Sequence, residues 1–141
     1  MKHITIYFLF LTTLFSAHAQ DVAFNFKNLE DAKKDPDQVE WLTLRDNGLK
    51  QFPMEILEFN NLKYLDLSEN DISVLPKEIG KLDHLFYLDL SGNHITTLPN
   101  EFSNIKTLRN LYLGYNGSLN LNHDIEVLSK LGSSGKPEEY Q

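Results

Sequence analysis

Two consecutive segments of the chain repeat one another with a period of 23 residues. Residues 62–84 read LKYLDLSENDISVLPKEIGKLDH, and residues 85–107 read LFYLDLSGNHITTLPNEFSNIKT. The flanking residues 39–61 and 108–130 continue the pattern without insertion, which gives four units in register. A fixed period of this length is typical of proteins that stack one small structural unit. Because a single unit cannot bury its apolar face alone, neighbouring units must pack together.

Within each unit, apolar residues alternate as they do in a half-buried β-strand. Leu65 and Leu67 are two residues apart, so a strand turns both toward the core. Tyr64, Asp66 and Ser68 alternate with them and are expected to face solvent. Applied to every unit, the period predicts parallel strands near residues 41–45, 64–68, 87–91 and 110–114.

Each predicted strand is followed by an asparagine and, farther along, by a short helical turn. In the second unit the asparagine is Asn70, which recurs as Asn47, Asn93 and Asn116. Its side chain is expected to satisfy backbone groups left unpaired at the bend. Pro76 suits the first position of a short helical turn, because its ring fixes φ.

The resulting pattern, LxxLxLxxNxLxxLPxxIxxLxx, resembles the leucine-rich repeat family over residues 39–130. The resemblance implies an α/β solenoid, a short right-handed horseshoe with parallel strands on the concave face. Short helical or extended segments are implied on the convex face. The family mostly binds other macromolecules through the concave face, so the resemblance implies recognition of a protein partner rather than catalysis.

The two ends of the chain differ from the repeats. Residues 1–19 contain Lys2, an apolar run and the sequence Ala-His-Ala, which predicts a secretory signal cleaved near Ala19. The run is too short to span a bilayer comfortably, so the mature chain is expected to have no membrane span. We therefore expect a secreted, periplasmic or cell-surface protein. Residues 20–38 read as an N-terminal cap, and residues 131–141 as a polar tail.

Composition narrows the classes of function. Removing Lys2 with the signal leaves 12 basic and 20 acidic residues, hence a net charge of −8. Such an acidic chain repels phosphate backbones, so nucleic acid is not expected as a partner. The chain has no cysteine, which excludes thiol catalysis and thiolate metal sites. His84, His94 and His123 occupy different repeat positions without ligand spacing, so no metal or cofactor is predicted.

The outward strand positions form the candidate binding surface. The third position of each unit carries Trp41, Tyr64, Tyr87 and Asn110, and the fifth carries Thr43, Asp66, Asp89 and Tyr112. Aromatic neighbours on adjacent strands stabilise a sheet without any ligand. Large aromatics on a rigid concave face also suit recognition, because such side chains are enriched at binding hot spots. We expect ligand contacts at Trp41, Tyr64, Asp66, Tyr87, Asp89 and Tyr112, with solvated acids that favour a basic partner.

Two alternatives to protein recognition follow from the same residues. Aromatic platforms also stack on sugar rings, so a glycan-binding or adhesion module is the main rival. An enzymatic reading rests on bacterial leucine-rich repeat effectors that carry a ubiquitin-ligase domain, whose catalytic cysteine this chain lacks. The sequence does not name the partner.

Overall fold

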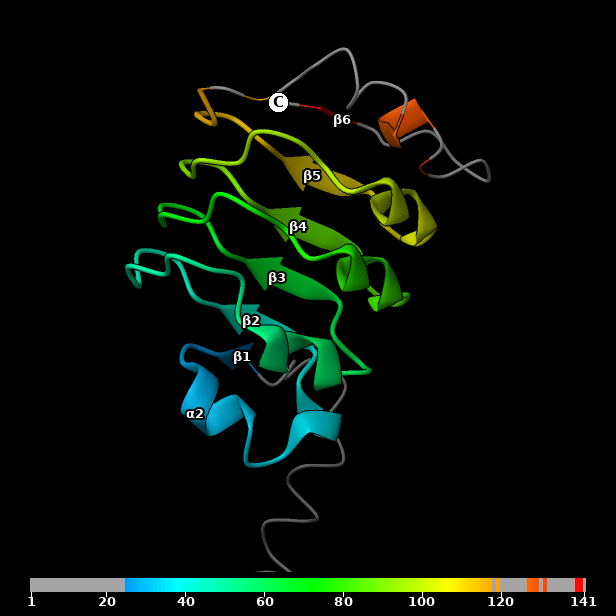
Figure 1. Ribbon diagram of the computed structural model, residues 1–141. Helices are drawn as coiled ribbons and strands as arrows, with labels where there is room; N and C mark the ends of the chain where they lie inside the picture. The colour runs from blue at the N-terminus through cyan, green and yellow to red at the C-terminus, as the bar shows by residue number, and fades with distance from the viewer. Residues whose placement is uncertain (1–24, 118, 120–126, 130, 132–138, 141) are drawn as a thin grey trace, which may run out of the picture.

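The computed structural model describes residues 25–117, 119, 127–129, 131 and 139–140. The chain forms a solenoid in which each repeat adds one parallel strand to a single sheet (Figure 1). The sheet runs in sequence order through β1 (Asn25–Phe26), β2 (Trp41–Thr43), β3 (Tyr64–Asp66), β4 (Tyr87–Asp89), β5 (Asn110–Tyr112) and β6 (Glu139–Tyr140). The register follows the sequence period, because Trp41 pairs with Tyr64 and Tyr64 pairs with Tyr87. The predicted leucine-rich repeat solenoid is confirmed.

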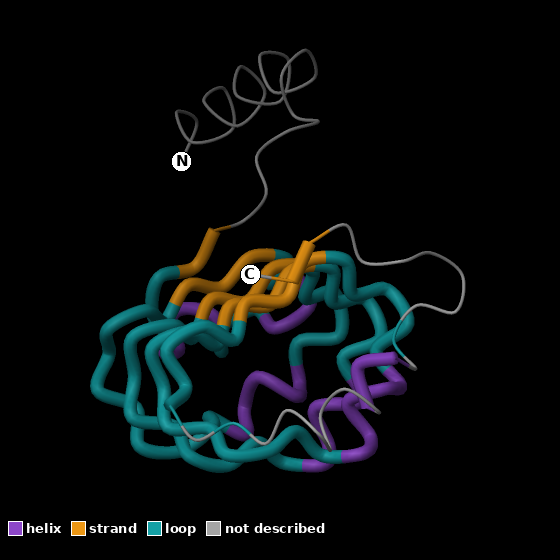
Figure 2. Tube along the Cα trace, turned by 90° about the horizontal axis from the view of Figure 1, so that it is seen from above, coloured by secondary structure: helices purple, strands orange, loops and turns teal. Residues whose placement is uncertain are grey.

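Helical segments lie across the coil from the strands (Figure 2). They are the 3-10 helices η2 (Met54–Glu58), η3 (Lys77–Lys81) and η4 (Asn100–Asn104) of the repeats, whereas the short α2 (Leu29–Ala32) and η1 (Pro36–Gln38) precede β2, and α2 contacts β1. Pro76 stands immediately before η3 rather than at its first residue, with an extended ψ of 147°. Pro53 and Pro99 precede η2 and η4 in the same way. The helical turns therefore begin one residue later than the sequence suggested.

The core lies between the strands and the 3-10 helices. Leu65 and Leu67 are fully buried, and so are the equivalent Leu88 and Leu90 of the next unit. Ile79 of η3 reaches the same core from the opposite side. The strand alternation read from the sequence is thus confirmed, although each central strand spans three residues rather than the five expected.

Beyond the end of each strand, the chain bends at the eighth position of every repeat. Asp46, Glu69, Gly92 and Tyr115 occupy this position, with φ values of 52°, 55°, 63° and 58°. This left-handed region disfavours residues that carry a Cβ atom. The repeat geometry imposes the bend whichever residue is present, and glycine stands there in one unit alone.

The asparagine after each bend links one repeat to the one before it. Asn93 donates from Nδ2 to the carbonyl oxygens of Leu67 and Leu90, at 2.9 and 3.1 Å, and accepts from the amide of Ile72 at 3.0 Å. Asn70 makes the equivalent bonds one repeat earlier. Asn47 is the exception, because no repeat precedes it. It is exposed, and its Nδ2 donates to the carbonyl of Arg45.

The described part of the predicted N-terminal cap holds β1, α2 and η1 ahead of the first repeat strand. The Asn28 side chain accepts the amide of Asp31 at 2.8 Å and so caps α2. Ala32 of α2 is fully buried against the first repeat. In addition, β1 pairs in parallel with β2, which extends the sheet beyond the predicted repeats.

At the other end, part of the predicted tail adds the last strand to the sheet. The tail returns to the sheet, because Glu139 and Tyr140 of β6 pair with Asn110 and Leu111 of β5. An unpaired strand edge leaves backbone donors and acceptors without partners, and β6 supplies them. Leu131, at the start of the predicted tail, is buried.

Two predictions concern residues that lie outside the described part. The signal at residues 1–19 and its cleavage near Ala19 are not described. Within the described residues, no helix is long and apolar enough to cross a membrane.

Candidate binding site

Four aromatic side chains from adjacent strands form a continuous stack, called here the aromatic ridge: Trp41, Tyr64, Tyr87 and Tyr112. The ring centroids of Trp41 and Tyr64 are 4.5 Å apart with 6° between their planes. Those of Tyr64 and Tyr87 are 4.1 Å apart at 11°. Tyr87 and Tyr112 are 5.2 Å apart with planes tilted by 42°. The structure therefore brings together the aromatic residues that the sequence singled out.

The ridge changes column at its last step. Trp41, Tyr64 and Tyr87 are register partners, but the partner of Tyr87 on β5 is Asn110. Tyr112 pairs instead with Asp89, two residues farther along β4. Diagonal neighbours of this kind remain within reach of aromatic side chains. Tyr112 thus continues the ridge from the fifth repeat position rather than the third.

Stacking covers most of the ring faces within the ridge. Tyr64 has an aromatic neighbour on each side, whereas the described contacts of Trp41 include one ring, and Trp41 remains 38% exposed. Burial is the main cause that raises the pKa of Tyr64 above its usual value, and the nearby Asp66 and Asp89 charges add to the effect. Burial also raises the pKa of Tyr87, together with its interaction with the Tyr64 hydroxyl. Both hydroxyls therefore stay protonated, and the ridge presents ring edges and neutral hydroxyls.

The prediction of solvated acids beside the ridge is wrong for Asp66. Its exposed fraction is 9%, and its Oδ1 accepts from the Ser68 amide at 3.0 Å and from Ser68 Oγ at 2.6 Å. Ser68, also expected to face solvent, is fully buried. The sequence alternation placed both on the outer side of the strand but did not show the neighbouring side chains that cover them.

Asp89 is half-buried and makes the same local bonds in the next repeat. Its Oδ1 accepts from the amide and the hydroxyl of Ser91, at 2.9 and 2.5 Å. These bonds hold the carboxylate against its own backbone bend. Asp66 and Asp89 are register partners on β3 and β4, as expected, but their arrangement favours a structural role at the bend.

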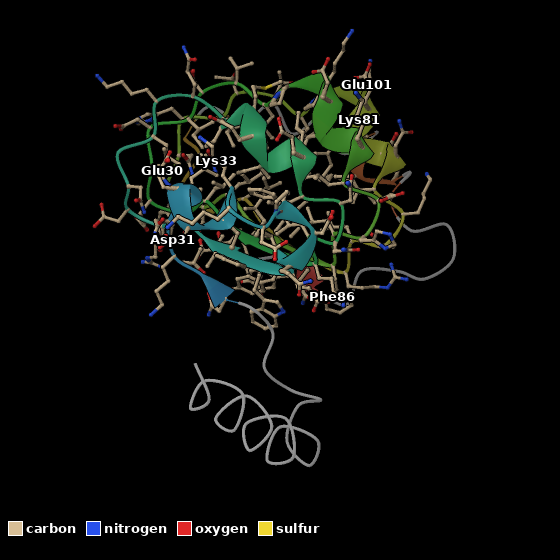
Figure 3. The ribbon with its side chains drawn as sticks, turned by 90° about the horizontal axis from the view of Figure 1, so that it is seen from below. Glu30, Asp31, Lys33, Lys81, Phe86 and Glu101 are labelled. Atoms are coloured by element: carbon tan, nitrogen blue, oxygen red, sulfur yellow. The ribbon has the colours of Figure 1, made fainter. Side chains whose placement is uncertain are left out.

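An open groove adjoins the ridge where the strands begin and is called here the rim groove. It has a volume of about 570 Å³ and is mainly apolar. Its lining comprises Trp41, Lys63, Tyr64, His84, Phe86, Tyr87, Thr107 and Arg109. Phe86 is 51% exposed and lies on the strand side of the molecule, opposite the helical side that carries Lys81 and Glu101 (Figure 3).

Sequence reasoning missed the polar lining of this groove. Lys63, Phe86 and Arg109 share the second position of their repeats, and His84 and Thr107 share the last. Phe86 was expected to extend the aromatic stripe near one rim, but the polar members of these two columns were left out. The 23-residue period could have revealed these columns, because residues 23 apart lie side by side on neighbouring repeats.

The cations of the groove differ in their partners. Lys63 Nζ lies 2.9 Å from Glu40 Oε1. Arg109 NH1 instead donates to the carbonyl oxygens of Lys106 and Leu108, at 3.1 and 3.2 Å. Among the described residues, no cluster of three or more His, Cys, Asp or Glu side chains is arranged to hold a metal ion.

Comparison with known proteins agrees with this architecture. A family model described as a leucine-rich repeat region matches residues 38–136. The chain therefore belongs to the leucine-rich repeat family. A search of curated proteins found no significant match.

Several solved structures share the fold. A leucine-rich repeat protein of Leptospira interrogans is 39% identical over 65% of this chain and 24% of its own, with a TM-score of 0.61. A plant peptide hormone receptor, solved in complex with its hormone, is 34% identical over 56% of this chain and 13% of its own, with a TM-score of 0.51. An internalin of Listeria monocytogenes matches at 21% identity and a TM-score of 0.60, over 76% of this chain and 31% of its own. The chain thus spans less than a third of each of these proteins.

Proposed function

We propose that the protein is an exported leucine-rich repeat module that recognises a protein partner on its strand face. The observation that carries the proposal is the aromatic ridge with the rim groove beside it. Large apolar side chains on a solvated sheet face expose area that water disfavours, and a partner that covers them gains that energy. Tyr and Trp are also the side chains most enriched at binding hot spots.

The similar plant receptor was solved in complex with a peptide hormone, and we extend this binding of a polypeptide, but not of that ligand, to the present chain. A role as a catalyst has less support. The aromatic ridge and the rim groove supply rings, two cations, one histidine and the Thr107 hydroxyl, which donates to backbone carbonyls, so no described nucleophile there is held by a base. We accordingly propose a binding role rather than an enzymatic one.

The geometry of the ridge argues against a glycan platform. A sugar ring stacks on the face of an aromatic side chain, but Tyr64 has each face against another ring. The ring edges and hydroxyls that remain suit contacts with polypeptide side chains. A glycan array incubated with the protein checks this point, and selective retention of sugars would favour the rival function.

Export is the second half of the proposal and rests on the sequence of residues 1–19. Expression of the full chain in a secreting bacterial host, followed by N-terminal sequencing of exported protein, should give Gln20 as the first residue. Retention of Met1 on protein confined to the cytoplasm would contradict export.

The binding test compares two substitutions of exposed apolar residues. Wild-type protein, Trp41→Ser and Met54→Ser are each used as bait for surface extracts, and captured proteins are identified by mass spectrometry. Trp41 lies on the ridge, whereas Met54 is 51% exposed on η2, across the coil. We expect a partner captured by the wild type and Met54→Ser but lost with Trp41→Ser. Equal capture by all three would place binding elsewhere.

A further inference from the structure

Arg109 is the cation of the rim groove that has no carboxylate partner among the described side chains. The residue is half-buried, and its guanidinium donates to two backbone carbonyls, those of Lys106 and Leu108. No carboxylate among the described side chains forms an ion pair with it, whereas the Lys63 charge at the same groove is matched by Glu40 at 2.9 Å. The two carbonyls restrict the position of the guanidinium without neutralising its charge.

Phe86 places an apolar surface directly beside this cation. The two residues occupy the same position in consecutive repeats, and the Arg109 amide donates to the Phe86 carbonyl at 2.9 Å. The Phe86 side chain is 51% exposed, and the Tyr87 and Trp41 rings line the same groove. An apolar surface therefore adjoins a fixed hydrogen-bond donor with positive charge, which is the arrangement that binds an apolar group next to an anion.

The net charge of the whole chain also favours an acidic ligand at this site. The full sequence carries a net charge of −7, so a basic peptide would be attracted to much of its surface without distinction. An acidic peptide is repelled from most of that surface. A site whose arginine has no described carboxylate partner is then the place where an acidic group gains local attraction.

We infer that the rim groove binds an acidic peptide segment in which an apolar side chain adjoins an Asp or Glu. This inference rests on the proposed function and assigns the partner chemistry of one part of the strand face. The apolar side chain packs on Phe86, and the neighbouring carboxylate accepts hydrogen bonds from Arg109. The occupant is thus a segment of a partner protein, bound at the start of β4 and β5.

A peptide library gives a test that needs no knowledge of the natural partner. A phage library of random peptides is selected on the full chain, and a synthetic peptide of an enriched sequence is titrated by fluorescence anisotropy. We expect enriched sequences to contain Asp or Glu beside Phe, Leu, Ile or Tyr. Arg109→Gln should weaken binding of that synthetic peptide about tenfold or more. Arg109→Lys, which keeps the charge, should retain part of the affinity.

Arg45→Gln is the matched control. Arg45 is an exposed arginine outside the groove, 3.9 Å from Glu69, and its loss changes the net charge equally. Arg45→Gln should leave the affinity for the peptide unchanged. If both substitutions weaken binding equally, Arg109 acts only through long-range attraction, and the inference is overturned. Replacing the peptide's acid by its amide should reproduce the effect of Arg109→Gln on wild-type protein.

Other outcomes separate the inference from the proposed function. Enrichment of basic peptides, or failure to enrich any peptide, overturns the acidic-peptide site, while capture that depends on Trp41 would still support protein recognition. Tighter peptide binding after deletion of residues 132–141 would show that the chain's own acidic end occupies the groove, and would also overturn a partner as its occupant.

Discussion

Tyr64 and Tyr87 stack face to face on adjacent strands, with ring centroids 4.1 Å apart and 11° between the planes. The contact follows from the register, because both occupy the third position of their repeats. The stacking contact has two consequences. The rings stabilise the pairing of β3 and β4, and they leave edges and hydroxyls at the centre of the strand face.

Replacement of a ridge residue should therefore affect stability in proportion to its stacking. Tyr64 has two ring neighbours and Trp41 has one among the described contacts. We expect Tyr64→Ser to lower the free energy of unfolding by about 1–3 kcal/mol, through two lost stacks and lost burial. Trp41→Ser should cost less. Urea unfolding of both variants checks the order, and a larger loss for Trp41→Ser would contradict the stacking argument.

Stability should also fall at high pH because of the same pair. In the folded protein the pKa values of Tyr64 and Tyr87 lie above the usual value of 10.0, mainly through burial. The unfolded chain then loses these protons at a lower pH than the folded chain. Their contribution is present below about pH 10 and is lost as the pH rises above it. Urea unfolding at pH 9 and pH 11 measures the loss.

Phenylalanine variants supply the control for this pH effect. Tyr64→Phe combined with Tyr87→Phe keeps the stacked rings but removes both titrating hydroxyls. The double variant should lose less stability between the two pH values than the wild type does. A wild type and double variant with the same slope would show that other groups cause the effect.

The fold was predictable because one rule acts on every repeat. The 23-residue period alone places Leu65, Leu88 and Leu111 in one row, and the alternation within each strand then fixes which side is buried. The same rule gives the Trp41–Tyr64–Tyr87 column. If the register of one repeat is misassigned by one residue, comparison with the other repeats corrects it.

The features that the sequence did not predict depend on how the side chains pack in the folded protein. Alternation places Asp66 on the outer side of β3, yet Asp66 is buried and bonded to Ser68. The left-handed bend was also missed, because Glu69 and Tyr115 carry no glycine signal at that position. The rim groove arises where several columns meet, so no single column of residues indicated it.

The asparagine that links repeats should contribute strongly to stability. Asn93 is 2% exposed, and its loss leaves the Ile72 amide without its acceptor and removes one of the two asparagine donors to each of the Leu67 and Leu90 carbonyls. We expect Asn93→Ala to cost about 1–3 kcal/mol. Asn47→Ala is the matched control, because Asn47 is exposed and its side chain donates to one neighbouring carbonyl. The control should stay within about 0.5 kcal/mol of wild type in urea unfolding.

Strain at the bend predicts a substitution that increases stability. Glu69 adopts a φ of 55°, where a residue with a Cβ costs roughly 1–2 kcal/mol. The next repeat shows that glycine is compatible, because Gly92 adopts 63° at the equivalent position. Glu69→Gly should raise the free energy of unfolding by a few tenths to about 1 kcal/mol, because glycine's entropy cost offsets part of the relief. Thermal unfolding checks the sign, and a decreased midpoint would show that Glu69 side-chain contacts outweigh the strain.

One glycine on the helical side of the coil should not tolerate a larger residue without a loss of stability. Gly80 of η3 lies so close to η4 that an added Cβ would stand 2.3 Å from the carbonyl oxygen of Glu101. That oxygen belongs to the backbone of η4, so relief requires the two helical turns to move apart and to loosen the core between the repeats. We expect Gly80→Ala to cost about 1–3 kcal/mol, the range for overpacking a well-packed site.

Gly114→Ala separates this clash from the general effect of replacing glycine. An added Cβ at Gly114 meets nothing within 4 Å, and Gly114 does not adopt a positive φ. Its substitution should leave the free energy of unfolding unchanged or slightly raised, because alanine restricts the unfolded chain. Urea unfolding of the two variants side by side measures the difference. Equal stabilities would mean that η3 and η4 separate without cost, and that the close approach at Gly80 is not needed to hold adjacent repeats together.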